Sequence, residues 1–151
     1  MTRRRRLAAV LTALALTGCA SADADSVDLL VERVRVAEAP AGADTALYFE
    51  VRSETDDVLE RVDADFSTST SLHEIIEVGG GGIMTAVDAI DFPGGEAVEL
   101  EPFGDHVMLE VLEADLRPGQ QVSVTLQFAE YGPMQVVADV VGLLELAEEG
   151  S

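Results

Sequence analysis

Apolar and polar residues alternate along most of the chain beyond residue 26. The clearest example is segment 45–53, in which Leu47, Phe49 and Val51 occupy every second position. A period of two is typical of a β-strand that buries one face. The same pattern predicts further strands at 27–37, 58–64, 70–78, 83–90, 97–100, 106–112, 121–129 and 134–141.

Glycine and proline mark the turns between these strands, because they supply or fix backbone angles that other residues avoid. These turns fall at 79–82, 93–95, 102–104, 117–119 and 131–133. About eight or nine short strands at regular spacing predict an all-β domain over residues 27–142, a Greek-key β-sandwich or small barrel. No convincing helical period follows the N-terminal apolar run, and residues 143–151 are expected to form a frayed acidic tail.

Composition narrows the possible functions. A chain of 151 residues fits one domain with a single core. Its 9 Lys plus Arg and 29 Asp plus Glu give a net charge of −20, which excludes a nucleic-acid partner because phosphate binding needs a basic surface. The single Cys excludes a disulfide within the chain. No paired nucleophile and base is present, so we do not expect an enzyme.

The N-terminus has the form of an export signal. Arg3 to Arg6 precede a short apolar run at 7–16, whose last residue begins the sequence Leu-Thr-Gly-Cys that ends at Cys19. This ending resembles the lipobox of bacterial lipoproteins, in which the Cys is lipidated. We therefore expect a signal peptide at 1–18, a lipid anchor on Cys19 with a tether at 19–26, and a domain held at the outer face of the cell membrane. The mature chain would carry five Arg and 29 acids, a net charge of −24.

Four residues form the candidate metal site: His73, Met84, His106 and Met108. His73 and His106 are the two histidines of the chain, and His106 and Met108 share one face of a predicted strand. Imidazole and thioether donors together favour Cu(I) over Zn²⁺, Mg²⁺ or Ca²⁺. Taken singly, a Met on a strand is usually core filling and a His is usually a surface or hydrogen-bonded polar residue.

The order and spacing of these residues, His-x10-Met-x21-His-x-Met, resemble the signature of the PCuAC family of periplasmic copper chaperones. The resemblance extends over residues 27–141. Matching segments are Ser71-Leu72-His73-Glu74, Phe92-Pro93-Gly94-Gly95, Val98-Glu99-Leu100, Pro102, Gly104, Ala46-Leu47-Tyr48-Phe49 and 122–128.

The resemblance implies a cupredoxin-like fold and one Cu(I) ion held by His73, Met84, His106 and Met108. It also implies delivery of that copper to a copper-accepting partner, the cytochrome c oxidase copper centre or another chaperone. The chain departs from the family at positions 75, 76 and 83, where Ile replaces the additional Met residues found in many members. The His- and Met-rich tail seen in some members is absent from this sequence, so we do not expect a second, Cu(II)-type site.

The sequence is also compatible with two other functions. A copper-sequestering tolerance or buffer lipoprotein would use the same four ligands without a specific acceptor. A lipid-anchored Ig-like interaction module would bind no metal, and its His and Met residues would be incidental. The sequence distinguishes neither the general from the twin-arginine export route, nor a monomer from a copper-bridged oligomer.

Overall fold

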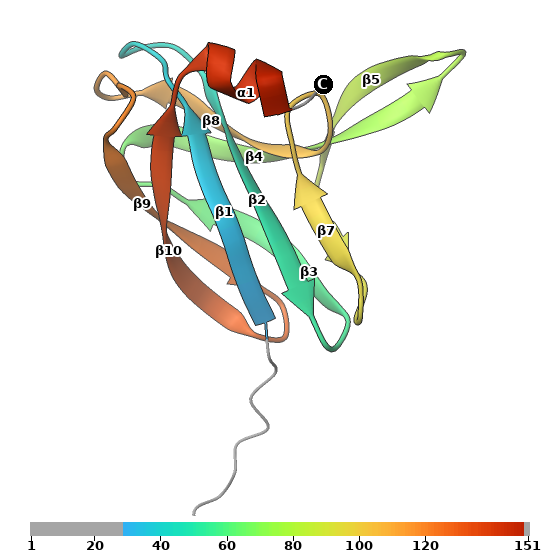
Figure 1. Ribbon diagram of the computed structural model, residues 1–151. Coiled ribbons are helices and arrows are strands. Elements are labelled where there is room, and N and C mark those ends of the chain that lie inside the picture. The colour runs from blue at the N-terminus through green and yellow to red at the C-terminus, as the bar shows by residue number, and fades with distance from the viewer. Residues whose placement is uncertain (1–28, 150–151) are drawn as a thin grey trace, which may run out of the picture.

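The computed structural model describes residues 29–149. The signal peptide, Cys19 and the tether expected from the sequence lie outside the described residues. Ten strands and one helix make up the described part (Figure 1). They are β1 (Leu29–Ala37), β2 (Thr45–Ser53), β3 (Asp57–Asp63), β4 (Ser67–Val78), β5 (Gly81–Val87), β6 (Ile90–Phe92), β7 (Ala97–Leu100), β8 (His106–Leu112), β9 (Gln121–Phe128), β10 (Gly132–Val141) and α1 (Leu143–Glu149).

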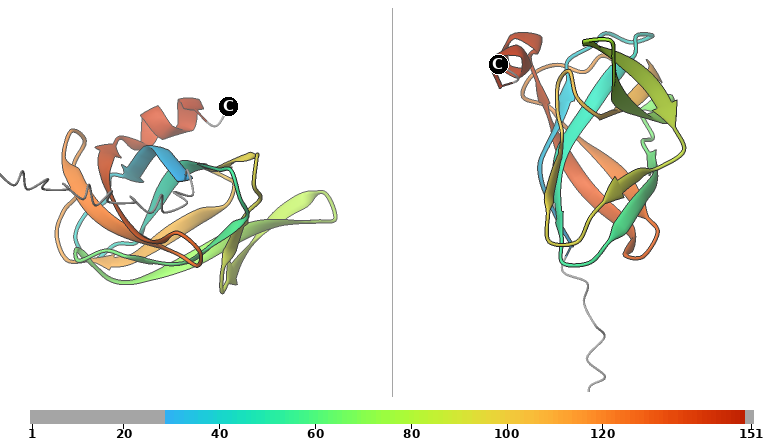
Figure 2. Two further views of the ribbon diagram at one scale, coloured as in Figure 1. Left: turned by 90° about the horizontal axis from the view of Figure 1, so that it is seen from below. Right: turned by 90° about the vertical axis from the view of Figure 1, so that its right-hand side faces the viewer.

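The strands form one sheet that curls into a flattened, open sandwich, as the two views of Figure 2 show. The strand order is β5-β4-β8-β2-β1-β10-β9-β3-β6, and β7 pairs with the second half of β2. All pairings are antiparallel except that of β1 with β10. The first half of β2 pairs with β8, which pairs in turn with β4. The all-β fold expected from the alternation is confirmed.

One predicted strand is wrong in its extent. The sequence pattern joined residues 83–90 into a single strand, whereas the structure has β5 and β6 with a break at Asp88 and Ala89. The two strands pair with different partners, β5 with β4 and β6 with β3. The chain must therefore turn between them, and the strand number rises from the expected eight or nine to ten.

The core lies between the two halves of the curled sheet. Leu47, Phe49 and Val51 of β2 are fully buried there, as their alternation predicted. Val107 and Leu109 of β8 are equally buried. Because successive side chains of a strand point to opposite faces, the residues between them on β2 and β8 must lie on the outer face of the sheet.

The C-terminal segment is a helix and not the frayed tail expected from the sequence. Residues 143–149 form α1, and Leu146 is buried to 3% exposure. Burial of one apolar side chain outweighs the low intrinsic stability of a two-turn acidic helix. Within residues 29–149, no helix has the length and apolar character needed to cross a membrane.

The hairpin of β4 and β5 extends beyond the sandwich (Figure 1). Its outer part exposes the apolar side chains Ile76, Val78, Ile83 and Met84. Gly79 and Gly80 form its tip with φ angles of 62° and 86°, a left-handed conformation that glycine adopts without strain. The hairpin therefore carries an apolar surface away from the core.

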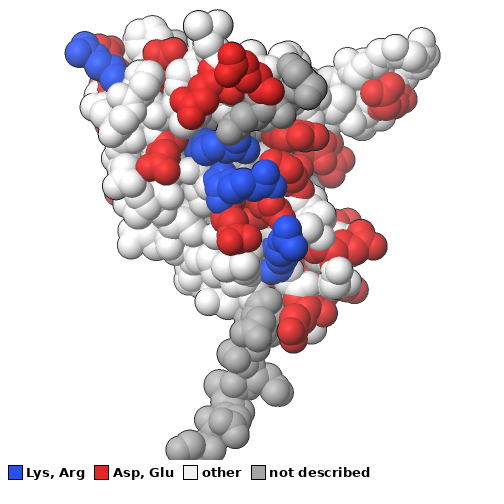
Figure 3. Space-filling view, in the orientation of Figure 1, with Lys and Arg blue, Asp and Glu red and all other residues white. Residues whose placement is uncertain are grey.

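Charged residues form a cluster on the outer face of β1, β2 and β7 (Figure 3). The buried carboxylate of Glu50 forms ion pairs with Arg33 and Arg52, and Arg33 also pairs with Glu99 over 3.1 Å. The pKa of Glu50 is lowered, first by its hydrogen bond from Arg33 and then by that from Arg52. This cluster satisfies the buried charge of Glu50.

Candidate metal centre

His73 on β4 and His106 on β8 are direct cross-strand partners. Residues directly opposite each other in an antiparallel pair project from the same face. Their rings stack at a centroid distance of 5.5 Å with an interplanar angle of 10°. The structure thus brings together two histidines that stand more than thirty positions apart in the sequence.

The two methionines lie on the same face, on either side of the histidine pair. Met84 on β5 is opposite Ile75, two residues after His73. Met108 on β8 is opposite Ser71, two residues before His73. The four candidate ligands therefore follow a diagonal across β5, β4 and β8, with the histidines in the middle and the thioethers at opposite ends.

The loop before β8 fixes the orientation of the His106 ring. Nδ1 of His106 lies 2.9 Å from the carbonyl oxygen of Gly104. A carbonyl only accepts hydrogen bonds, so Nδ1 carries the proton. In the neutral ring, Nε2 then holds the lone pair, which is the form in which imidazole binds a metal. His106 itself is 8% exposed.

The His73 ring has a different environment. Its Nε2 lies 2.9 Å from the hydroxyl of Ser71. Its Nδ1 is buried and has no hydrogen-bond partner. A buried ring nitrogen without a hydrogen-bond partner lowers the stability of the fold. A metal ion bound to this nitrogen would satisfy it.

Ser71 also connects His73 to a carboxylate. The Ser71 hydroxyl donates to Glu110 over 2.7 Å, and the Ser69 hydroxyl donates to the other carboxylate oxygen over 2.6 Å. These hydrogen bonds, Ser69 first and then Ser71, lower the pKa of Glu110, and the nearby His73 adds to the effect. Glu110 is therefore an ionised acceptor at neutral pH.

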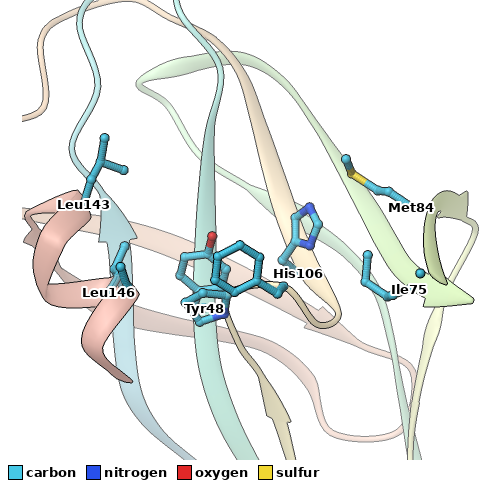
Figure 4. Close-up of a pocket in the computed structure, with 10 residues that line it drawn as sticks. Tyr48, Ile75, Met84, His106, Leu143 and Leu146 are labelled. Carbon is cyan, nitrogen blue, oxygen red and sulfur yellow. The ribbon is translucent and has the colours of Figure 1, made fainter. Parts of the chain in front are cut away.

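A largely apolar pocket of about 540 Å³ opens beside His106 (Figure 4). His106 lies between Tyr48 and Met84 on its wall, and Leu146 of α1 and Phe103 contribute to the lining. The Tyr48 ring centroid lies 6.4 Å from that of His106, and burial raises the pKa of Tyr48. His73 and Met108 do not line this pocket.

The arrangement suits a soft monovalent ion better than a hard one. Within residues 29–149, no group of three or more His, Cys, Asp or Glu side chains is placed to hold a metal ion. A metal at the histidine pair would therefore need the thioethers. Because the lone pair of imidazole lies in the ring plane, two stacked rings must tilt relative to each other to share one ion.

Ser71, Glu110 and Tyr48 did not emerge as site residues from the sequence. Ser71 precedes His73 by two positions and Glu110 follows Met108 by two, so the strand period alone could have placed them on the same face. Leu146 carried no such signal, because a seven-residue helix is too short to show a clear period.

Comparison with sequence families gives one match over most of the chain. The family model described as "Putative lipoprotein LpqE-like" matches residues 29–140. Among curated proteins, "Putative lipoprotein Lxx21020" of Leifsonia xyli subsp. xyli (strain CTCB07) is 34% identical over an alignment of 148 residues, and the match covers 91% of this chain and 88% of that protein.

Comparison with solved structures finds PCuAC domains. The copper-bound PCuAC domain from PmoF2 is similar with a TM-score of 0.63 and 24% identity, covering 76% of this chain and 92% of that one. The solution structure of CuI-DR1885 from Deinococcus radiodurans has a TM-score of 0.60 and 29% identity, covering 80% and 82%. The PCuAC resemblance and the cupredoxin-like fold are thus confirmed.

Proposed function

The chain belongs to the LpqE-like lipoprotein family, and from this membership and the site geometry we propose that it is an exported, lipid-anchored copper chaperone. In this proposal the protein is not an enzyme, because copper is the cargo that it delivers and not a catalytic cofactor. The observation that carries the proposal is the stacked pair of His73 and His106, each with one ring nitrogen available to a metal. Two similar structures, the copper-bound PCuAC domain from PmoF2 and CuI-DR1885, contain copper and support the choice of metal.

The proposed ligands are His73, Met84, His106 and Met108. Both imidazoles and both thioethers are neutral donors, so Cu(I) retains one positive charge in the site. Thioethers bind Cu(I) in preference to divalent hard ions. Methionine side chains are long and flexible, which suits two ligands that approach the histidine pair from opposite ends of a diagonal.

Transfer to an acceptor is consistent with the exposure of the site. Met84 is 51% exposed on the projecting hairpin, so a donor atom of a partner can replace it before the histidines release the ion. The proposed acceptor is a copper-binding protein outside the cell membrane, either the copper centre of cytochrome c oxidase or an intermediate chaperone. The acidic surface favours a partner with a basic docking face.

The proposed anchor is a lipid on Cys19, after removal of residues 1–18, with 19–26 as tether, 27–142 as the copper-binding domain and 143–151 as a C-terminal segment. A Cys19→Ser variant should leave the membrane fraction and lose the mass of the lipid. Retention of the variant in membranes would contradict the anchor without affecting the copper site.

A Cu(I) competition titration against a chromophoric chelator, without oxygen and under reducing conditions, tests the metal site on residues 20–151. We expect one equivalent of Cu(I) to bind. A variant with all four ligands replaced should lose it while keeping its circular dichroism spectrum. Met134→Leu is the matched control, because Met134 packs against the core on β10. No binding by the unaltered chain would overturn the proposal.

Delivery is tested separately from binding. The copper-loaded chain should transfer its Cu(I) to an apo oxidase copper domain within minutes of mixing, measured as the copper content of the acceptor after the two proteins are separated. Deletion in the cell should reduce oxidase activity. Tight binding without transfer, together with copper sensitivity on deletion, would identify a copper buffer instead.

A further inference from the structure

The two histidines of the site present different nitrogens. His106 donates from Nδ1 to a main-chain carbonyl, which leaves Nε2 for a metal. His73 has its hydrogen bond at Nε2 and its unpartnered, buried atom at Nδ1. The tautomer of His73 therefore determines whether the ligand atom on this ring has a lone pair.

The Ser71 hydroxyl determines the tautomer of His73, because the hydroxyl has only one proton to donate. Glu110 is a carboxylate and can only accept, so the proton of Ser71 goes to Glu110 in the 2.7 Å hydrogen bond. The hydroxyl oxygen then acts as acceptor toward His73. Nε2 of His73 must carry a proton to form the 2.9 Å contact, and in the neutral ring Nδ1 is the free base.

We propose that Ser71 and Glu110 are positioning residues that hold His73 as the Nε2–H tautomer and so direct its Nδ1 lone pair to Cu(I). The inference rests on the proposed function for the identity of the metal. Neither residue contacts the ion in this arrangement. They act through His73, by a chain of two hydrogen bonds that runs from Glu110 through Ser71 to Nε2.

This chain of hydrogen bonds has two effects on the ligand. It restricts the rotation of the ring about its side-chain bonds without preventing the tilt that sharing one ion with His106 requires, and the negative charge of Glu110 makes the imidazole a stronger donor. Ser69 provides an internal comparison, because its hydroxyl also donates to Glu110, over 2.6 Å, whereas the hydroxyl at Nε2 of His73 is that of Ser71. A general effect on the carboxylate would involve both serines, whereas a positioning effect requires Ser71 alone.

The first test measures the tautomer in the metal-free chain. Long-range ¹H–¹⁵N NMR spectra of the mature protein distinguish protonated from unprotonated ring nitrogens. We expect Nε2–H for His73 and Nδ1–H for His106. In Glu110→Leu, the Ser71 proton becomes free to donate to Nε2, so the Nδ1–H form of His73 should rise while His106 is unchanged. Nδ1–H at His73 in the unaltered chain would overturn the proposal.

The second test measures Cu(I) affinity by chelator competition. Ser71→Ala should lower the affinity about tenfold, the lower end of the range for groups that orient a ligating histidine. Ser71→Thr, which keeps the hydroxyl, should restore it, and Ser69→Ala should stay within about twofold of the unaltered chain. Equal losses in Ser71→Ala and Ser69→Ala would overturn the positioning role.

The two proposals fail in different ways. If the unaltered chain bound no Cu(I), the proposed copper function would be wrong, and the NMR spectra would still report the tautomer of His73. If it bound Cu(I) and Ser71→Ala changed neither tautomer nor affinity, the copper function would stand and the positioning role would fall. Should Ser71→Ala not fold, Glu110→Leu and Ser71→Thr decide the question.

Discussion

The carboxylate of Asp105 accepts a 2.9 Å hydrogen bond from the main-chain N–H of Ile75. Asp105 directly precedes His106, and Ile75 lies two residues beyond His73, opposite Met84. The same loop is closed by a 3.0 Å bond between the Gly104 N–H and the Glu101 carbonyl. The hydrogen bond between Asp105 and Ile75 thus connects the loop that orients His106 to the base of the hairpin that carries Met84.

Removing the Asp105–Ile75 hydrogen bond should weaken both copper binding and the fold. Asp105→Ala frees the loop and the hairpin base, so we expect the Cu(I) affinity to fall several-fold and the free energy of unfolding by about 1 kcal/mol, the loss of one partly exposed hydrogen bond. Asp105→Asn keeps an acceptor oxygen and should retain most of both. Chelator competition and urea unfolding measure the two quantities. If Asp105→Ala and Asp105→Asn had the same Cu(I) affinity, the hydrogen bond from Ile75 would have no role in the site.

Met108 does not line the pocket beside His106, so its substitution is a sharp test of the four-ligand set. Met108→Leu keeps the volume of the side chain and should lower the Cu(I) affinity by at least about tenfold through loss of the soft thioether donor. Met134→Leu should leave it unchanged. An unaltered affinity in Met108→Leu would remove Met108 from the ligand set.

The stability of helix α1 should depend on Leu146, one of its three leucines. Leu146 is 3% exposed and Leu144 is 84% exposed. Leu146→Ala should lower the free energy of unfolding by about 2 kcal/mol, as expected for a buried leucine, and expose the pocket beside His106. Leu144→Ala should have a small effect. Urea unfolding of both variants measures the difference, and similar losses would mean that α1 does not pack as described.

The charge cluster predicts a pH-dependent contribution to stability. Because the hydrogen bonds from Arg33 and Arg52 lower the pKa of Glu50 from 4.5, the carboxylate stabilises the fold fully above pH 4.5. That contribution disappears as the pH falls through the lowered pKa. The Tm difference between the unaltered chain and Glu50→Gln should therefore be largest near neutral pH and shrink in acid. Glu60→Gln, at an exposed position on β3, is the control and should show no such trend.

The alternation of residues predicted most of the sheet because it reflects a local property. Each of β2, β7 and β8 has the bounds that the sequence predicted, since a strand with one buried face must repeat every two residues. The same period placed His106 and Met108 on one face. It did not separate β5 from β6, because both halves of 83–90 are apolar and only their partners differ.

The sequence by itself therefore determined the fold class, the strands and the four candidate donors, which depend on local pattern and spacing. The tertiary structure alone decided that His73 faces His106, that Leu146 folds the C-terminal segment into α1, and that Ser71 connects His73 to Glu110. Each of these depends on contacts between distant segments. Such contacts are set by strand order and register, which form only when the whole sheet buries its core.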